Sequence, residues 1–393
     1  VRVDLDKAEK IKNDLWSQEK KLRKEIQKLS GHFVEVWSAA SVAKAFDALK
    51  IKYDRTPTGQ PKFDKNFLST HDSPLAKMVV TEREINKART TFIDTIVKHS
   101  HRGRIHAEIH QMRSDEGGTV TGRFSYSNPN LQQIPARHAI LGPLIRSIFI
   151  PEKDCEWGIF DYSQQEPRIV VHYASMKHFT GADKFVDSYR EDETTDFHKM
   201  VSEIADIPRK KAKTINLGLF YGMGKGKLMS QLGINLEDAT EMLANYNERV
   251  PFVKQLMNDT MNKASKKGYL STIEGRRCRF ELYEPTNEWG QKALPFKEAK
   301  DEYGEHMIKR AFTYKALNRL IQGSAADQTK KAMLELSKEG YLAHIQVHDE
   351  LDFSVATEKD KSRIKEIMEH AVKLEVPSKV DVECGDSWGK AGD

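Results

Sequence analysis

Apolar positions in the first hundred residues recur at the spacing of amphipathic helices. Between Leu5 and Leu29 they fall at roughly every third or fourth position, and Gly31 follows as a helix stop. A second stripe of the same kind runs from Ser73 to Val97. We expect two long helices that pack as an antiparallel pair, with a turn-rich loop over residues 56–61 between them.

After Gly103 the pattern changes to short β-prone runs and loops. Residues 143–161 are predicted to form strands, and residues 167–282 to be mainly helical. The last hundred residues are predicted to combine a helix over 306–337, a hairpin over 343–355 and a helix over 358–374. The chain is therefore expected to mix helical blocks with short strands.

Composition narrows the class of protein. With 393 residues, several subdomains that share a continuous interior are expected. Charged residues make up 31% and hydrophobic residues 38%, which is typical of a soluble globular protein. There is no apolar stretch that could span a membrane and no signal-peptide pattern. We therefore expect the cytosol or an equivalent reducing compartment, and not secretion.

The cysteines and the net charge add little to this picture. Cys155, Cys278 and Cys384 are isolated from one another and from zinc-ligand spacings, so neither a disulfide nor a structural zinc is expected. The net charge of +5 is only a weak indication of nucleic acid.

The segment from Trp157 to Ser163 reads as a buried strand that ends in a carboxylate, Asp161, shortly before a helix begins. Burial of a carboxylate is costly unless a cation or strong hydrogen-bond donors compensate its charge. The alternative is that Asp161 simply caps the helix, which is a common place for aspartate. This segment alone leaves both interpretations open.

A second acid, Asp349, lies where apolar and polar residues alternate from Ile345 to Val355. It occupies an apolar position, so it should either face a core or sit at a tight bend between two strands. Either placement calls for a compensating ion. Two such acids on neighbouring strands would form an oxygen-rich site suited to Mg²⁺, able to activate a 3′-hydroxyl and stabilise a leaving pyrophosphate.

Residues 208–222 combine helix boundaries with a basic run. Pro208 suits the first turn of a helix and Gly222 its end, and six basic residues with no acidic one lie between positions 209 and 227. Four-residue spacing puts four side chains on one face: Arg209, Lys213, Leu217 and Tyr221. A triphosphate along this face would offset the repulsion between like charges. The alternative is a basic surface helix that ends in an aromatic residue.

Three segments, in this order, resemble the signature motifs of family A DNA polymerases, the bacterial DNA polymerase I type. They are Asp161-Tyr162-Ser163-Gln164-Gln165-Glu166-Pro167-Arg168, the helix from Arg209 to Gly222, and His348-Asp349-Glu350. The resemblance extends to Thr121-Gly122-Arg123, to Asn130-Leu131-Gln132-Gln133-Ile134-Pro135, to Asp196-Phe197-His198, and to Asn318 with residues 321–327. It covers nearly the whole chain, and the ordered set is more specific than any single motif.

The resemblance implies an α+β fold shaped like a right hand, with palm, fingers and thumb subdomains and an antiparallel palm sheet. We expect the thumb over residues 1–108 and a first part of the palm over 109–166. The fingers are expected over 167–284 and the second part of the palm over 285–393.

The resemblance also implies roles for the matching residues. Asp161 and Asp349, with the backbone carbonyl of Tyr162, would hold two Mg²⁺ ions, for which Mn²⁺ could substitute, and Lys213 would act in catalysis. The residues implied to bind the deoxynucleoside triphosphate are Arg209, Lys213, His198, Tyr221, Leu217, Glu166 and Gln164. Glu166 with Tyr221 would exclude a ribose 2′-hydroxyl. The residues implied to contact primer-template DNA, largely without reading its sequence, are Arg123, Asn130, Gln132, Asn318, Gln322, His348 and Glu350.

Some of these residues have simpler explanations. Arg123 could be a surface arginine in a turn, and His198 could be the solvated start of a helix. Asn318 and Gln322 could cap or cross-link helices.

The sequence departs from the family pattern at several positions. Leu217 stands where phenylalanine or tyrosine is typical, and it lacks a hydroxyl, so poor acceptance of dideoxynucleotides is expected. Gln165 and Pro167 replace the usual aliphatic residues, as in phage or organelle relatives. Residues 283–305, with Trp289, look like an insertion. Asp154-Cys155-Glu156 lacks the downstream acids of an exonuclease, so no proofreading site is expected within this chain.

The expected reaction is template-directed addition of deoxynucleotides to a primer 3′-hydroxyl with release of pyrophosphate. Two other functions compete with it. Glu166 argues against a single-subunit RNA polymerase, and the retained Asp161 and Asp349 argue against a catalytically silent DNA-binding protein. We expect a monomer that binds primer-template DNA, and the resemblance implies a bacterial or phage-infected cytoplasm or an organelle matrix as its location. Because the chain begins at Val1, it is expected to be a fragment or processed product, with any exonuclease or other upstream domain outside it.

Overall fold

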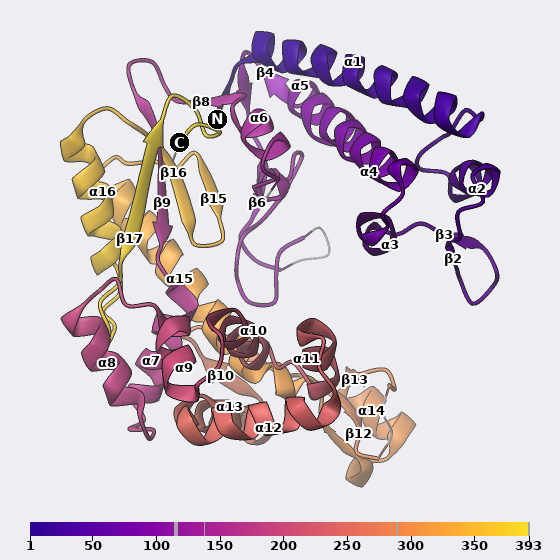
Figure 1. Cartoon of the computed structure of the whole chain (residues 1–393). Coiled ribbons are helices and arrows are strands. Elements are labelled where there is room, and N and C mark those ends of the chain that lie inside the picture. The colour runs from indigo at the N-terminus through magenta and orange to yellow at the C-terminus, as the bar shows by residue number, and fades with distance from the viewer. Residues whose placement is uncertain (114–116, 137, 288–289, 392–393) are drawn as a thin grey trace.

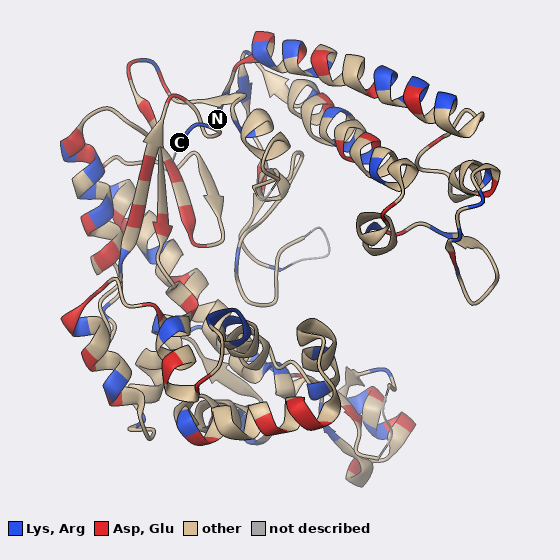
Figure 2. Cartoon of the chain, in the orientation of Figure 1, with Lys and Arg blue, Asp and Glu red and all other residues tan. Residues whose placement is uncertain are grey.

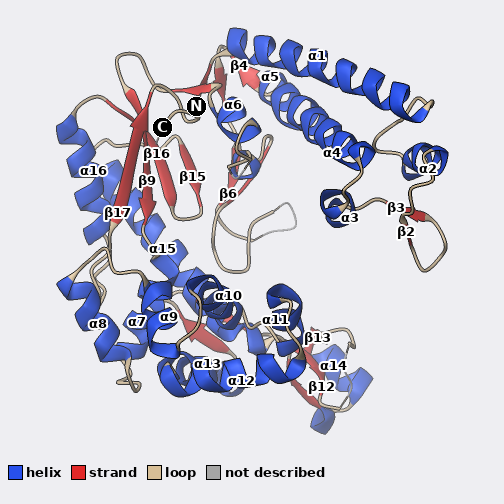
Figure 3. Cartoon of the chain, viewed as in Figure 1, coloured by secondary structure: helices blue, strands red, loops and turns tan. Residues whose placement is uncertain are grey.

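The computed structural model describes residues 1–113, 117–136, 138–287 and 290–391 (Figure 1). Long helices predominate, and the strands gather into several small sheets (Figure 3). A helical arm, a central sheet and a helical lobe follow one another in space.

The arm contains the predicted antiparallel helix pair (Figure 1). Asp4 caps the first helix by accepting a hydrogen bond from the Lys7 backbone N–H at 2.9 Å, and Gly31 ends it with φ 71°. The elements of the arm are α1 (Leu5–Ser30), α2 (Ala39–Ala48), β2 (Asp54–Arg55), β3 (Pro61–Lys62), α3 (Lys65–Thr70), α4 (Pro74–Lys87), a π-helical turn (Ala88–Ile93) and α5 (Asp94–Lys98).

The central sheet has the order β15-β16-β9-β17, and every neighbouring pair is antiparallel. Side-chain alternation on β9 puts Phe160 and Tyr162 into the core formed with α15 and α16. Trp157 and Ile159 face a second core on the other side. The strands are β9 (Glu156–Tyr162), β15 (Ile345–Val347), β16 (Glu350–Val355) and β17 (Val380–Gly385), and the helices are α15 (Ala316–Lys338) and α16 (Glu358–His370).

The helical lobe packs against α15 around one large apolar core that includes Phe185, Phe197, Phe220 and Phe252. Its helices are α7 (Gln165–Ser175), α8 (Ala182–Glu191), α9 (Phe197–Ala205), α10 (Arg209–Phe220), α11 (Lys225–Leu232), α12 (Leu236–Arg249) and α13 (Pro251–Lys267). A short hairpin of β10 (Tyr269–Ser271) and β11 (Arg277–Arg279) interrupts the predicted helical block.

Smaller elements complete the fold. Next to the central sheet lie β1 (Arg2–Val3), β4 (Ser100–His101), β5 (Arg104–Ile105), β6 (Glu108–His110), β7 (Ser125–Ser127), α6 (Leu141–Arg146) and β8 (Phe149–Ile150). At the far end of the lobe lie β12 (Leu282–Pro285), β13 (Leu294–Pro295), α14 (Phe296–Tyr303) and β14 (Ile308–Arg310). The suspected insertion thus contributes to a three-stranded sheet covered by one helix, while Trp289 lies outside the described residues.

Two sequence-based predictions of secondary structure were wrong in part. Residues 143–146 belong to helix α6, not to a strand, because Leu141, Ile145 and Ile148 follow helical spacing and are all buried. The helix predicted from residue 306 begins only at Ala316. Phe312 has φ 60°, a left-handed conformation that a continuous helix cannot contain.

None of the helices in the described part of the chain has both the length and the apolar character needed to cross a membrane.

Candidate active site

The two predicted carboxylates meet at one end of the central sheet. Asp161 is near the end of β9, in register with Glu350 on β16. Asp349 lies in the tight bend between β15 and β16. Of the two placements expected for an acid at an apolar position, a bend between strands is therefore the one observed. The Tyr162 backbone N–H donates to the Asp349 carbonyl at 3.3 Å. The pairing of β9 with β16 therefore brings the two acids together.

These carboxylates repel each other in the absence of a counter-charge. Desolvation by the surrounding protein raises the pKa of Asp161 to about 8, and the charges of Asp349 and Glu350 add to that shift. Burial also raises the pKa of Asp349. A divalent cation would remove this repulsion, so the charge balance of the pair fits a metal-binding role.

Within the described ranges, no cluster of three or more His, Cys, Asp or Glu side chains could hold a metal ion. As metal ligands, Asp161 and Asp349 would supply two carboxylates, and the Tyr162 carbonyl directly follows Asp161 in the chain. Mg²⁺ commonly takes one or two carboxylates and completes its shell with water and substrate phosphates. This donor set fits magnesium better than an ion that needs a full cage of protein ligands.

A cavity of about 410 Å³ opens beside Asp349. It is lined by residues from α7, α9 and α10, from the segments next to them, and from the β15–β16 bend, and all seven predicted nucleotide-binding residues take part. The lining residues are Arg123, Gln164, Gln165, Glu166, Pro167, Asp196, His198, Arg209, Lys213, Leu217, Tyr221, His348 and Asp349. The spacing argument for α10 is thereby supported, because its four predicted side chains face one cavity.

His198 enters the cavity as a neutral ring. Its Nδ1 accepts a hydrogen bond from the Asn216 amide at 2.9 Å, and the Asn216 carbonyl accepts one from the Tyr246 hydroxyl. Burial lowers the pKa of His198 to about 4, and the Lys213 and Arg209 charges act in the same direction. With Nδ1 as acceptor, Nε2 carries the hydrogen and can donate to an anionic ligand.

The two cations of α10 differ in their surroundings. Arg209 pairs with Asp196, whose Oδ2 accepts from Nε at 2.8 Å. Asp196 also caps α9 by accepting from the His198 backbone N–H at 2.8 Å. Lys213 is exposed, and no ion pair is found for it among the described residues. Basic residues mark α10 opposite the acidic strands of the central sheet (Figure 2), so Lys213 is the free positive charge of the cavity.

Glu166, at the start of α7, accepts hydrogen bonds from two residues that are distant from it in the chain. Its Oε1 accepts from Arg123 at 2.8 Å, and its Oε2 accepts from the Tyr221 hydroxyl at 3.0 Å. Burial, followed by the charge of Glu166, raises the pKa of Tyr221 to about 12, so the phenol keeps its proton. Arg123 is thus an ion-pair partner inside the cavity and not a free arginine in a surface turn.

Gln164, which also lines this cavity, holds the start of α9 in place. It adopts a left-handed backbone conformation with φ 53° just before α7. Its side-chain amide donates to the Thr195 carbonyl at 2.9 Å and accepts from the Phe197 backbone N–H at 2.8 Å. These two bonds fix the start of α9, and with it His198, next to β9.

A second cavity, of about 310 Å³, contains Asp161 and Glu350 together with Arg146, Asp381 and Glu383. Trp388 donates from Nε1 to the Glu350 carboxylate at 3.3 Å. Asp161 and Asp349 thus line different cavities, although the Asp349 carbonyl accepts from Tyr162, the residue that follows Asp161. The sequence did not anticipate this division.

The other predicted DNA-contacting residues lie outside the first cavity. Asn130 caps the short 3₁₀ turn Leu131–Gln133 by accepting from the Gln132 backbone N–H at 3.1 Å, and the Gln132 side chain donates to the Gln346 carbonyl at 3.1 Å. Asn318 and Gln322 lie on α15, where Gln322 interacts with the Tyr221 hydroxyl. Their predicted contacts with DNA remain predictions.

Comparison with known proteins agrees with this arrangement. The family model described as DNA polymerase family A matches residues 5–390. The chain belongs to DNA polymerase family A. Palm, fingers and thumb are therefore the appropriate names for its central sheet, its helical lobe and its helical arm.

Several polymerases of this family are similar along nearly the whole chain. A DNA-directed DNA polymerase of Pseudomonas phage M6 is 36% identical over 440 aligned positions, covering 99% of this chain and 63% of that protein. DNA polymerase I of Bacillus subtilis is 30% identical over 414 positions, covering 99% of this chain and 43% of that protein. The chain thus spans less than two thirds of the length of these relatives.

A solved structure shares the fold. The POL domain of Pol1 from M. smegmatis, in complex with DNA primer-template and dNTP, matches with a TM-score of 0.78 and 28% sequence identity. The match covers 100% of this chain and 68% of that chain.

Sequence reasoning missed two contributors to the family A site. Asp196 was noted only as part of a motif, yet it neutralises Arg209 and caps α9. An aspartate directly before a helix, in a chain with an unexplained basic helix, was the available signal. Gln165 lines the cavity and donates to Gln328 at 3.2 Å, and no feature of its sequence context indicated this contact.

Proposed function

We propose that this chain is a template-directed DNA polymerase that adds deoxynucleotides to a primer 3′-hydroxyl and releases pyrophosphate. One observation carries the proposal: a single cavity joins Asp349, the exposed Lys213, the neutral donor His198 and the Glu166–Tyr221 pair. Family membership and the relatives named above support it. The subdomain limits proposed are 1–108 for the thumb, 109–166 and 285–393 for the palm, and 167–284 for the fingers.

In this proposal the triphosphate lies along α10. Lys213 and Arg209 would contact its phosphates as charged donors, and His198 would donate from Nε2. Arg209 would exchange or share its Asp196 partner when the nucleotide binds. Tyr221, at the end of the same helix, would lie beside the base.

Asp161 and Asp349, with the Tyr162 carbonyl, would hold two Mg²⁺ ions, for which Mn²⁺ could substitute. When bound, such ions activate the attacking hydroxyl and stabilise the leaving pyrophosphate. The side chains of the protein would bind and orient the nucleotide and neutralise its charge. The α10 cations would neutralise the phosphates, and Glu166, held by Arg123 and Tyr221, would leave no room for a ribose 2′-hydroxyl.

Primer extension with Mg²⁺ on an undamaged template tests the proposal. Deoxynucleotides and ribonucleotides are offered separately, and products are resolved at single-nucleotide length. Extension with deoxynucleotides only is expected. Efficient extension with ribonucleotides would favour an RNA polymerase, and tight DNA binding without extension would favour a silent accessory protein. We also propose that this chain does not trim 3′ ends, which incubation of the primer-template without nucleotides would check. We propose that it acts as a monomer, which sedimentation would check.

Leu217 allows a separate prediction about the sugar. Its half-buried side chain lines the cavity without a hydroxyl, so it cannot replace a hydrogen bond that a missing 3′-hydroxyl would have made. We expect dideoxynucleotides to be incorporated poorly. Leu217→Tyr should raise dideoxy incorporation relative to deoxy incorporation by about tenfold, the worth of one hydrogen bond.

Leu217→Phe is the matched control, because it adds the same ring without the hydroxyl. Competition between each dideoxynucleotide and its deoxynucleotide on one template gives the ratio directly. Near-equal use of both substrates by the unmodified chain would contradict this prediction.

A further inference from the structure

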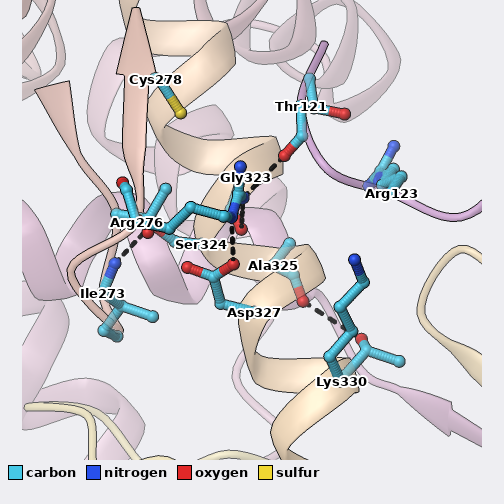
Figure 4. A network of polar contacts seen from close by, with 12 residues as sticks. Thr121, Arg123, Ile273, Arg276, Cys278, Gly323, Ser324, Ala325, Asp327 and Lys330 are labelled. Atoms are coloured by element: carbon cyan, nitrogen blue, oxygen red, sulfur yellow. Dashed lines mark hydrogen bonds and ion pairs between the residues drawn. The ribbon is translucent and has the colours of Figure 1, made fainter. Parts of the chain in front are cut away.

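One guanidinium outside the cavity connects two segments that carry site residues (Figure 4). Arg276 lies at the end of the turn between β10 and β11. Its carbonyl accepts hydrogen bonds from the Thr272 backbone N–H at 2.9 Å and from the Thr272 hydroxyl at 3.1 Å. The turn therefore fixes the backbone from which this side chain extends.

The Arg276 side chain reaches three acceptors on two other segments. Its Nε donates to the Asp327 carboxylate on α15 at 2.8 Å. Its Nη2 donates to the Thr121 carbonyl at 2.7 Å and to the Gly323 carbonyl at 3.0 Å. The palm loop before Arg123 is thereby joined to α15 through a single planar group.

Two glycines make room for this group. Gly122 has φ +84°, and a Cβ atom added to it would lie 2.7 Å from Arg276 Cζ. A Cβ atom added to Gly323 would lie 3.1 Å from Arg276 Nη2. A side chain at Gly122 would have to displace the guanidinium and would also be strained at this positive φ, and one at Gly323 would press on the guanidinium, so both glycines keep the backbone close to Arg276.

The segments that Arg276 joins lead directly to Glu166. Thr121 lies two residues before Arg123, which donates to Glu166 Oε1 at 2.8 Å. Gly323 follows Gln322, which interacts with the Tyr221 hydroxyl, and that hydroxyl donates to Glu166 Oε2. Glu166 Oε1 is therefore held by a residue two positions from the Thr121 carbonyl, and Oε2 is held by a hydroxyl that interacts with Gln322, the neighbour of Gly323; Arg276 binds the backbone carbonyls of both Thr121 and Gly323.

We infer that Arg276 is a positioning residue for the Glu166–Tyr221 pair and so sets selection between deoxynucleotides and ribonucleotides. It acts through the Thr121 and Gly323 carbonyls and does not line the cavity itself. This inference rests on the proposed function. With the loop displaced, Arg123 would no longer fix Glu166, and the carboxylate could turn aside for a 2′-hydroxyl.

Arg276→Lys tests the inference because it keeps the positive charge beside Asp327 but removes the planar fork that serves both carbonyls. Steady-state kcat/KM is measured for single insertions of dCTP and of CTP opposite a template guanine. The deoxy-to-ribo ratio is expected to fall about tenfold, a loss in keeping with a small misplacement of a site residue. The value for dCTP should change less than the ratio.

Two companion variants separate positioning from folding. Arg277→Lys is the matched control, since Arg277 is the exposed neighbour whose guanidinium lies over the Tyr269 ring at 4.7 Å, and its ratio should stay at the wild-type value. Gly122→Ala leaves Arg276 intact but introduces the Cβ atom that the guanidinium excludes, and it should lower the ratio as Arg276→Lys does. Thermal unfolding of each variant is followed by circular dichroism.

An unchanged deoxy-to-ribo ratio in Arg276→Lys and Gly122→Ala would overturn the inference, even with a lower Tm, because a merely structural role moves Tm alone. An equal fall in Arg277→Lys would overturn it as well. Failure of the wild-type chain to extend any primer would instead contradict the proposed function. The two failures are therefore distinguishable in one set of assays.

Discussion

Replacement of Asp349 by alanine is expected to lower kcat for primer extension by roughly 10³-fold, the effect of losing several kcal/mol of metal-assisted stabilisation. Asp349 is one of the two side-chain carboxylates proposed above to hold the Mg²⁺ ions. Its removal would leave Asp161 as the other proposed carboxylate ligand. Binding of primer-template DNA should persist, because the variant removes a negative charge and no DNA-contacting group.

Extension by Asp349→Ala is measured under single-turnover conditions, and DNA binding by fluorescence anisotropy. Asp381→Asn is the matched control. Asp381 is in register with Asp161 on the next strand, but it is paired with Lys379 at 2.7 Å and lines only the second cavity. It should retain most of the activity. Unchanged extension by Asp349→Ala would contradict the proposed mechanism. Equal losses in both variants would indicate that Asp349 contributes only negative charge and not a specific contact.

Replacement of Lys213 by methionine is expected to lower kcat/KM for deoxynucleotides by about 10²-fold. A hydrogen bond to a charged group contributes about 1.5–3 kcal/mol, and about 1.4 kcal/mol corresponds to a factor of ten. Methionine keeps most of the length and the helix propensity of lysine. The loss therefore reports the charge of the cavity and not the stability of α10.

Lys210→Met is the control on the same helix. Lys210 is exposed and lies outside the cavity lining, so its removal changes the net charge of α10 by the same amount. Its kcat/KM should remain within about twofold of the wild-type value, as expected for a screened surface charge. Similar losses in both variants would indicate that α10 acts only through its overall charge.

The sequence predicted the elements whose patterns are long or strongly marked. The first helix has both a capping aspartate, Asp4, and a terminating glycine, Gly31, and it appears with nearly the predicted bounds. The hairpin around Asp349 was also predicted, because alternation over many positions defines a strand. Ile145 was misplaced because a short apolar run satisfies helical and strand spacing equally well.

The cavity lining was predicted better than the contacts within it. Four-residue spacing correctly aligned Arg209, Lys213, Leu217 and Tyr221 toward one cavity. Spacing along one helix cannot reveal a partner from another element, however. Only the fold therefore shows that Arg209 pairs with Asp196 and that Arg123 donates to Glu166. The contacts of Arg276 depend on three segments at once, and no local pattern carries such information.

The strand order of the palm has a consequence for biosynthesis. Strand β9, which carries Asp161, lies between β16 and β17, two strands that the ribosome delivers only after the whole fingers lobe. Until then β9 lacks both of its neighbouring strands, and an unpaired strand edge is prone to self-association. The carboxylate pair can form only when translation has reached β16.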